Sequence, residues 1–272
     1  MFPLVLGLLV GLSMALTGAG GGILAVPLLV FALRLPLGAA APIGLIAVGL
    51  GAAVSGLLGL RDGIVRYRAA MLMGGLAMVV APLGVAAARR VPNAPLTIAF
   101  AAVLALSAWR MWQRARLALR TSAGAGQARI ELPCVLDARD GRLVWTRPCA
   151  QALALTGLAA GLLSGLLGVG GGFVIVPALT RYTELSARSV VATSVAVIAL
   201  ASVGGVGAAA WHGLVAWDIA LPFALGSVMA AVLARSVATR VSGPRLHQGF
   251  AVVSAVIAVL LLARGLGFSP MR

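Results

Sequence analysis

Two glycine-rich strings carry the most distinctive chemistry of this 272-residue chain. Glycine disfavours a helix by about 1 kcal/mol relative to alanine, so four glycines within five residues predict a break in each apolar segment. A helix that restarts after such a break directs free N–H groups and the positive end of its dipole into the break, and this arrangement binds anions. Both strings read GxGGGxxxxP, and their glycines and prolines are Gly18, Gly20, Gly21, Gly22, Pro27, Gly168, Gly170, Gly171, Gly172 and Pro177.

Glycines in a membrane could also serve only to bring helices close together, as GxxxG pairs do. Gly7 with Gly11, and Gly157 with Gly161, fit that packing role. For the GxGGG strings we favour an anion site that binds substrate. The two prolines are expected in the first turns of the restarted helices, where a missing N–H does least harm.

Hydroxyl side chains within the apolar segments are a second class of anion ligand. Thr193 and Ser194 are the strongest pair, because they lie early in the segment that follows the second string. The alternative is that each hydroxyl bonds a backbone carbonyl one turn back. All the candidates are Thr17, Ser55, Ser107, Ser164, Thr193, Ser194 and Ser202.

The centres of the apolar segments carry no acidic residue. Carriers of cations usually need such a carboxylate, so this absence argues against a cation substrate. The sequence also contains no cluster with metal-ligand spacing and no hydrolase motif. We therefore expect no metal, no cofactor and no enzymatic activity.

The composition is that of an integral membrane protein, with 61% apolar and 10% charged residues and a mean hydropathy of +1.09. Soluble domains carry about 25% charged residues, so a soluble enzyme is excluded. All 21 basic residues are arginines that lie between or beside apolar segments, where membrane topology explains them better than binding to nucleic acid. We predict an all-α, polytopic transmembrane helical bundle with apolar segments at 2–33, 38–60, 69–88, 94–112, 150–180, 187–210, 218–234 and 249–265.

The chain also repeats itself. Residues 7–30 and 157–180 are identical at 12 of 24 positions when they are offset by 150, and Gly63 aligns with Gly213 at the same offset. Internal duplication on this scale is typical of secondary transporters. The predicted organisation is a first transmembrane repeat at 1–112, a polar, arginine-rich linker at 113–149 and a second transmembrane repeat at 150–272.

The segments 2–33 and 150–180 are too long for one straight crossing, because a helix of 32 residues would be about 48 Å long against a core of ~30 Å. If all eight segments crossed, the arginines would divide 13 to 8 between the two sides. If these two are re-entrant hairpins, the repeats are inverted and the arginines divide 16 to 5, which places the N-terminus outside and the linker in the cytoplasm. The 16 are Arg61, Arg66, Arg68, the eight in 110–147, Arg181, Arg188, Arg235, Arg240 and Arg245.

Three further features carry expectations of their own. In a cytoplasmic linker Cys134 and Cys149 would be reduced thiols, whereas a disulfide requires an oxidising compartment. The stretch CVLDARDGRLVW predicts a small β-hairpin around Asp140 and Gly141. His212 lies on a connector between two tryptophans and could relay protons, but we interpret it as an interfacial residue.

At the paired GxGGGxxxxP strings the sequence resembles the TauE/SafE family of sulfite exporters, bacterial permeases also described as anion transporters. The resemblance covers nearly the whole chain and implies transport of sulfite, sulfonates or similar sulfur anions across the cytoplasmic membrane. The motif positions of the family carry over onto the ten glycines and prolines named above. Many members have an Ala-Thr-Ser string after the second motif, matched here from Ala192 to Ser194, whereas the first half has Pro42, Ile43 and Gly44.

We therefore predict a permease that exports small anions, of the sulfite or organosulfonate type, from the cytoplasm by alternating access. The anion would bind between the two glycine breaks, to helix N-termini and to Thr193 and Ser194. The expected partners are this anion and the lipid bilayer of the inner membrane, with proton coupling left open and no nucleic acid. Two rivals remain: a membrane assembly factor that transports nothing, and a membrane-embedded enzyme.

Overall fold

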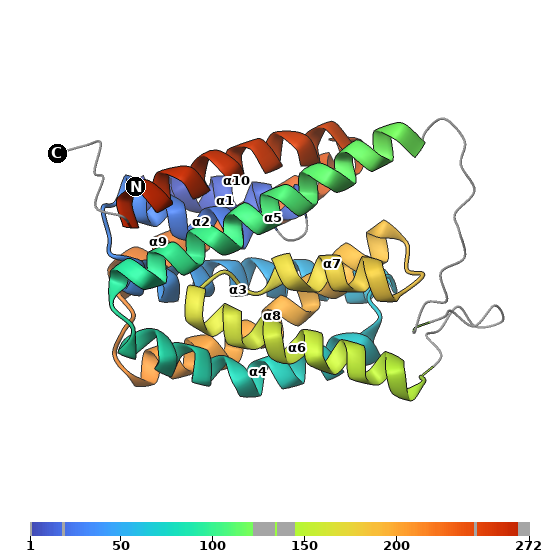
Figure 1. Cartoon of the computed structure of the whole chain (residues 1–272), viewed down its shortest axis with the longest axis horizontal. Coiled ribbons are helices and arrows are strands. Elements are labelled where there is room, and N and C mark those ends of the chain that lie inside the picture. Colours follow the sequence, from blue (N-terminus) through green and yellow to red (C-terminus); the bar gives the residue numbers. More distant parts are fainter. Residues whose placement is uncertain (1, 18–19, 122–133, 135–144, 242–243, 266–272) are drawn as a thin grey trace.

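The structure is a computed structural model that describes residues 2–17, 20–121, 134, 145–241 and 244–265 (Figure 1). Its helices are α1 (Phe2–Thr17), α2 (Gly20–Ala32), α3 (Leu37–Arg61), α4 (Tyr67–Arg90), α5 (Asn93–Thr121), α6 (Arg147–Leu167), α7 (Gly172–Tyr182), α8 (Ala187–Trp211), α9 (Trp217–Val241) and α10 (Pro244–Gly265). Among the described residues, α3, α4, α5, α6 and α8 are long and apolar enough to cross a membrane. The prediction of an all-α transmembrane bundle is confirmed.

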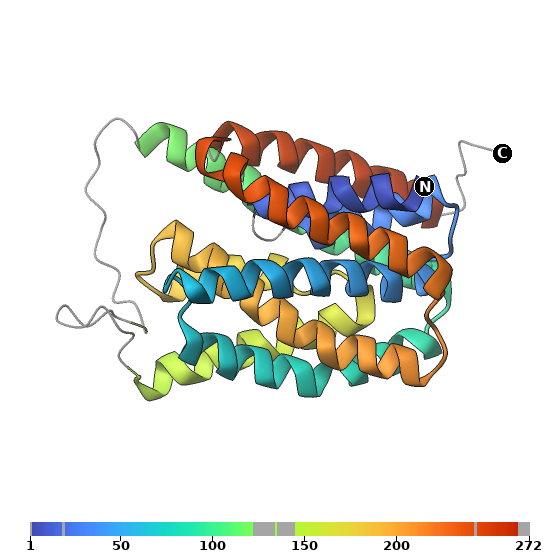
Figure 2. The same ribbon diagram turned by 180° about the vertical axis from the view of Figure 1, so that it is seen from behind.

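Each glycine string lies at the junction of two helices that pack against each other. α1 ends at Thr17 and α2 begins at Gly20, while α6 ends at Leu167 and α7 begins at Gly172. The hairpin α1–α2 opens toward the end of the molecule that carries the N-terminus, here called the N-terminal end (Figures 1 and 2). The hairpin α6–α7 opens toward the opposite end, here called the linker end, where α5 finishes. The two hairpins therefore enter the bundle from opposite ends.

The two prolines do not lie where the sequence predicted. Pro27 is the eighth residue of α2 and Pro177 the sixth of α7, so the expected position in the first turn is wrong. The reason is that each helix restarts within the glycines themselves rather than closer to the proline. Because proline has no N–H, the carbonyl groups of Ile23 and Phe173, four residues earlier, lose their helical donors.

The connector after α3 and the connector after α8, 150 residues later, have the same backbone conformation at their glycine. Gly63, after α3, and Gly213, after α8, both have positive φ, at 68° and 66°. The N–H of Gly63 donates to the carbonyl oxygen of Leu60 at 3.1 Å, and that of Gly213 donates to Ala210 at 3.0 Å. The aligned residues of the two halves thus form the same turn at the linker end and at the N-terminal end.

The two halves are interleaved. α1 packs against α9, where a Cβ on Gly11 would overlap the carbonyl oxygen of Ser227. α6 packs against α4, where a Cβ on Gly161 would lie 2.5 Å from the Cα of Ala77. Gly161 and Ser227 are the 150-residue counterparts of Gly11 and Ala77, so each half contributes its first helix to the other half. These glycines have the packing role that the sequence suggested for them.

A disulfide closes the linker end of the second hairpin. Cys134 and Cys149 are bonded to each other, with their Cα atoms 5.0 Å apart, so the expectation of reduced thiols is wrong for this structure. Cys134 lies beside the end of α7, where its N–H donates to the carbonyl oxygen of Tyr182 at 3.1 Å. Cys149 lies in the first turn of α6, which packs against α7, so the two cysteines meet. The hairpin expected around Asp140 and Gly141 lies outside the described residues.

The disulfide predicts how a cut linker behaves. A site-specific protease sequence can be inserted between Asp140 and Gly141, and the purified, air-oxidised chain can then be cut there. We expect the two fragments to stay joined by the disulfide. They should separate on a denaturing gel only after a reductant is added, because one cysteine lies on each side of the cut. A Cys149→Ser variant is the control and should give two fragments without reductant. Separation of the wild-type fragments without reductant would contradict the bond.

Candidate functional site

The two glycine strings meet in the centre of the bundle. A Cβ on Gly22, in the first turn of α2, would overlap the carbonyl oxygen of Val169 in the second string. A Cβ on Gly168 would likewise overlap the backbone of Ala41 in α3. Gly21 packs against Met14 of α1, Gly20 begins α2, and Gly18 lies outside the described residues.

The second string is a left-handed turn made of glycine. Gly168, Gly170 and Gly171 have φ values of 71°, 75° and 70°, a region that is strained for residues with a side chain. Gly168 ends α6, where its N–H donates to the carbonyl oxygen of Ser164 at 2.8 Å, and Gly171 is the N-cap of α7. These residues let the chain reverse within the bundle.

The first two amides of α7 have no acceptor with hydrogen-bond geometry among the residues that the structure describes. The first donors of the helix are Val174 and Ile175, which both bond the carbonyl oxygen of Gly171, at 3.0 and 3.2 Å. The amides of Gly172 and Phe173, which precede them, have no acceptor within the described part of the chain. Such amides, at the positive end of a helix dipole, suit an anion.

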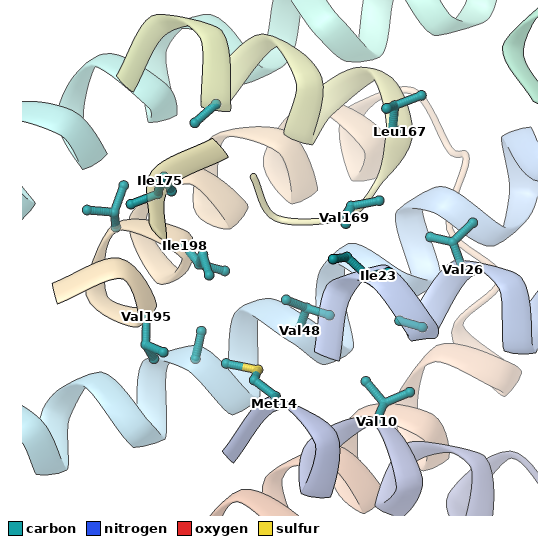
Figure 3. Close-up of a cluster of buried hydrophobic side chains, with 14 of the residues drawn as sticks. Val10, Met14, Ile23, Val26, Val48, Leu167, Val169, Ile175, Val195 and Ile198 are labelled. Atoms are coloured by element: carbon teal, nitrogen blue, oxygen red, sulfur yellow. The ribbon is translucent and has the colours of Figure 1, made fainter. Parts of the chain in front are cut away.

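Apolar side chains fill the space around this turn (Figure 3). Val48, Val169 and Ile198 are all buried, and a Cβ on Gly170 would lie 2.9 Å from Cγ2 of Ile198 and 3.0 Å from Cγ1 of Val48. The expected polar space between the two breaks is therefore closed in this conformation.

A cavity of about 340 Å³ reaches the second glycine turn from the N-terminal end. Gly168 is part of its lining, together with Pro42 of α3, and Arg89 is its single charged lining residue. Beside it lies a second hollow lined by Ala86, Arg89, Arg90 and His212. A cluster of basic and neutral polar groups at the mouth attracts anions rather than cations.

The hydroxyls predicted to bind the anion are bonded to protein groups. Thr193 and Ser194 are both fully buried in α8. The Oγ1 of Thr193 accepts a hydrogen bond from the N–H of Arg66 at 3.1 Å, and the Oγ of Ser194 donates to the carbonyl oxygen of Val191 at 2.8 Å. Ile198 is the residue of α8 that contacts the glycine turn. It lies five positions after Thr193, which is about 7.5 Å along the helix.

Several polar groups near the site were missed by sequence reasoning. Arg89 was taken only as a mark of topology, although it stands two residues from Val91 and the turn into α5, where a cavity mouth can form. Ser164 was one of seven hydroxyl candidates, and it is fully buried with no hydrogen-bond partner for its Oγ in the described structure. Its position one helical turn before Gly168 could have indicated from the sequence that it lies next to the glycine turn.

The helices and the site define a polytopic α-helical membrane protein in which two internal hairpins bring broken helix ends to the centre. The sequence matches the family described as sulfite exporter TauE/SafE over residues 4–261, and the chain belongs to this family of membrane transporters.

Similar proteins carry the same kind of name. A "Probable membrane transporter protein" of Xylella fastidiosa strain Temecula1 is 27% identical over 265 residues, which cover 94% of this chain and 92% of that protein. Its counterpart from strain 9a5c is 28% identical over 268 residues. "Probable membrane transporter protein MamO" of Paramagnetospirillum magneticum is 32% identical over 163 residues, 52% of this chain and 24% of that protein. No solved structure matches the chain.

Because the two strings are in contact, one methyl group added at Gly22 should lower the stability of the protein strongly. Gly22→Ala should destabilise the protein by about 1–3 kcal/mol, because the methyl group overlaps a backbone carbonyl rather than a flexible side chain. For a chain of this size that lowers the midpoint of thermal unfolding in detergent by roughly 3–10 °C. Gly207→Ala in α8 is the matched control, since nothing lies within 4 Å of its Cβ position. Equal midpoints for the two variants would contradict the contact.

Proposed function

We propose that this membrane transporter is a permease for small anions, of the sulfite or organosulfonate type, that exports them across the inner membrane. The observation that carries the proposal is the cavity in which Arg89 is the single charged lining residue and Gly168 belongs to the lining. A positive mouth that leads to a turn with free amides suits a compact oxyanion. The sulfur substrate is supported by the description of the family. The ten glycines and prolines of the two strings, with Thr193 and Ser194, remain our proposed binding region.

We propose alternating access as the mechanism. The apolar contacts among Val48, Val169 and Ile198 form the barrier, and the cavity on the N-terminal side of them represents access from one end. Because the halves are interleaved, the moving bodies are the packed sets rather than the two sequence halves. One set joins α1 and α2 to α9, and the other joins α6 and α7 to α4. Rocking of these sets would part the glycine contact of Gly22 with the second string.

We place the linker end in the cytoplasm, because the predicted topology puts 16 of the 21 arginines on that side. The disulfide between Cys134 and Cys149 argues against this orientation, because cytoplasmic reductants keep thiols reduced. Alkylating intact cells before the linker is cut tests this orientation. If alkylation in the cell blocks the thiols, so that the cut fragments separate without reductant, the result supports this orientation. If the disulfide is already formed in the cell, the linker end lies outside instead.

The transport proposal predicts saturable sulfite flux in proteoliposomes, inhibited by a competing sulfonate such as methanesulfonate. A pH gradient of either sign, applied in the same assay, shows whether protons are coupled. Gly171→Val is the matched inactive control, because a β-branched residue is strained at a φ of 70°. It should abolish flux without changing the amount of inserted protein. Absence of flux for every sulfur oxyanion, in folded wild-type protein, would overturn the substrate class.

Removing the charge at the mouth should weaken uptake from the N-terminal end. We expect Arg89→Gln to raise the KM for sulfite about tenfold, corresponding to ~1.4 kcal/mol, because this arginine lines both the cavity and the hollow beside it. Arg90→Gln removes the same charge from the hollow alone and should change KM by less than threefold. Equal effects of the two changes would show a general field rather than a cavity site.

A further inference from the structure

The cavity beside Arg89 has its polar side chains at one end. It follows α3 from Gly38 to Leu45, seven positions that span about 10 Å of helix. Asn93, the first residue of α5, stands beside Gly38, because its Oδ1 would lie 3.5 Å from a Cβ on that glycine. Arg89 belongs to the last turn of α4 and lines the same cavity. The outer end of the cavity thus offers one guanidinium group and one amide group.

The inner part of the cavity is lined by apolar side chains. Leu45 of α3 and Val85 of α4 are both buried, and Val85 lies one helical turn deeper than Arg89. α8 closes the wall behind Leu45, since a Cβ on Gly205 would lie 2.5 Å from its Cδ2. The other large apolar side chains of the lining are Leu96, Leu166 and Leu214. Apolar walls with a few polar groups that fix orientation are the usual form of a site for a small organic ligand.

The cavity is larger than a bare sulfur oxyanion needs. Its volume is about 340 Å³. Sulfite has four non-hydrogen atoms, and at about 30 Å³ for each water-sized atom it would occupy roughly 120 Å³, or about a third of the space. A six-carbon chain on a sulfonate head raises the count to ten atoms, roughly 300 Å³ by the same measure. The remaining wall is apolar, and it favours a ligand whose own carbon atoms cover it.

The lining also limits the charge of the ligand. Arg89 is the single charged residue that lines the cavity. A ligand with a second anionic group would place that group between the buried side chains of Leu45 and Val85, where no cation compensates it. The lining therefore favours one negative charge, held at the outer end.

We propose that this cavity takes an amphiphilic monoanion. A singly charged oxyanion head lies beside Arg89 and Asn93, and an apolar tail of about six carbons reaches Leu45. The head is a sulfonate or a carboxylate, because an arginine pairs with either group. The assignment of this ligand as the transported substrate rests on the proposed function, which it narrows from inorganic sulfite to organic acids with a short tail.

The test is titration calorimetry of the full chain in nanodiscs of phosphatidylcholine, with empty nanodiscs as the blank for partition into lipid. The probes are the sodium salts of sulfite and of methane-, butane-, hexane- and octanesulfonate. Affinity should rise about two- to fourfold with each carbon up to hexanesulfonate, because each methylene is buried against apolar wall. Octanesulfonate should bind no tighter than hexanesulfonate, because its twelve atoms would need roughly 360 Å³. Affinity that does not change with chain length overturns the proposal.

A second pair of ligands tests the single charge. Hexane-1,6-disulfonate has the tail of hexanesulfonate and a second head at its far end. It should bind at least tenfold more weakly than hexanesulfonate, because that head meets only apolar side chains. Equal or tighter binding of the disulfonate would show a second cationic partner and overturn the assignment of a monoanion.

Two substitutions separate the head of the ligand from its tail. Arg89→Gln should weaken every sulfonate by a similar factor of about ten and leave the increment per carbon unchanged. Ala88→Phe places a ring in the cavity, so it should weaken hexanesulfonate at least tenfold and methanesulfonate less than threefold. Ala87→Phe is the matched control, because Ala87 lies on the same helix and lines neither the cavity nor the hollow beside it. If Ala88→Phe and Ala87→Phe bind hexanesulfonate equally well, the tail lies elsewhere and the site is overturned.

The outcomes distinguish this site from the transport proposal and from a lipid site. Arg89-dependent binding that strengthens with chain length, without flux of any probe in proteoliposomes, keeps the site and refutes transport. Sulfite flux that hexanesulfonate inhibits no better than methanesulfonate keeps transport and refutes the tail. Affinity that continues to rise through octane- and decanesulfonate means that the tail extends into the bilayer. The occupant would then be a lipid, and the proposal of a short-tailed anion would be wrong.

Discussion

A helix that stops inside a bilayer leaves amide and carbonyl groups that lipid cannot satisfy, and this constraint governs the arrangement of the rest of the molecule. The turn at Gly168 is covered by α3 at Ala41, by the first hairpin at Gly22 and by α8 at Ile198. The long helices α3 and α8 pack against each other, and the two hairpins approach from opposite ends. The bundle thus shields two interrupted helices from lipid, and a cavity beside Arg89 gives access to the turn.

Among the described residues, the unpartnered polar groups include both donors and acceptors. The amides of Gly172 and Phe173 lack an acceptor, the carbonyl groups of Ile23 and Phe173 lack a helical donor, and three serine hydroxyls have no partner. The chain as a whole carries a net charge of +15, and no carboxylate lies in the centre of an apolar segment. A positive net charge without such carboxylates supports the proposal of an anion rather than a cation as the substrate.

The helical fold and the junctions at the glycine strings could be predicted because they depend on local properties: hydropathy, segment length and the helix cost of glycine. The prolines were placed wrongly, since the restart point of a helix depends on what packs around the glycines. The role of Thr193 depends on a distant backbone group, the N–H of Arg66, whereas Ser194 bonds the carbonyl oxygen of Val191 in the preceding turn, which was the alternative weighed for each hydroxyl. The disulfide was missed for a similar reason, because it depends on the docking of Cys134 against α7.

The exchange of first helices between the halves also sets the order in which the protein can be completed. α1 ends at Thr17, but its partner α9 begins at Trp217, so 200 residues must be made after α1 before the partner exists. At about 5–20 residues per second this takes about 10–40 s of synthesis. During that time the close-packing face of α1 at Gly7 and Gly11 faces lipid or the insertion machinery. When α6 is made, its partner α4 is already complete, so α6 can pack at once. The packing of α1 must wait for α9, so the contact between the halves is completed late in translation.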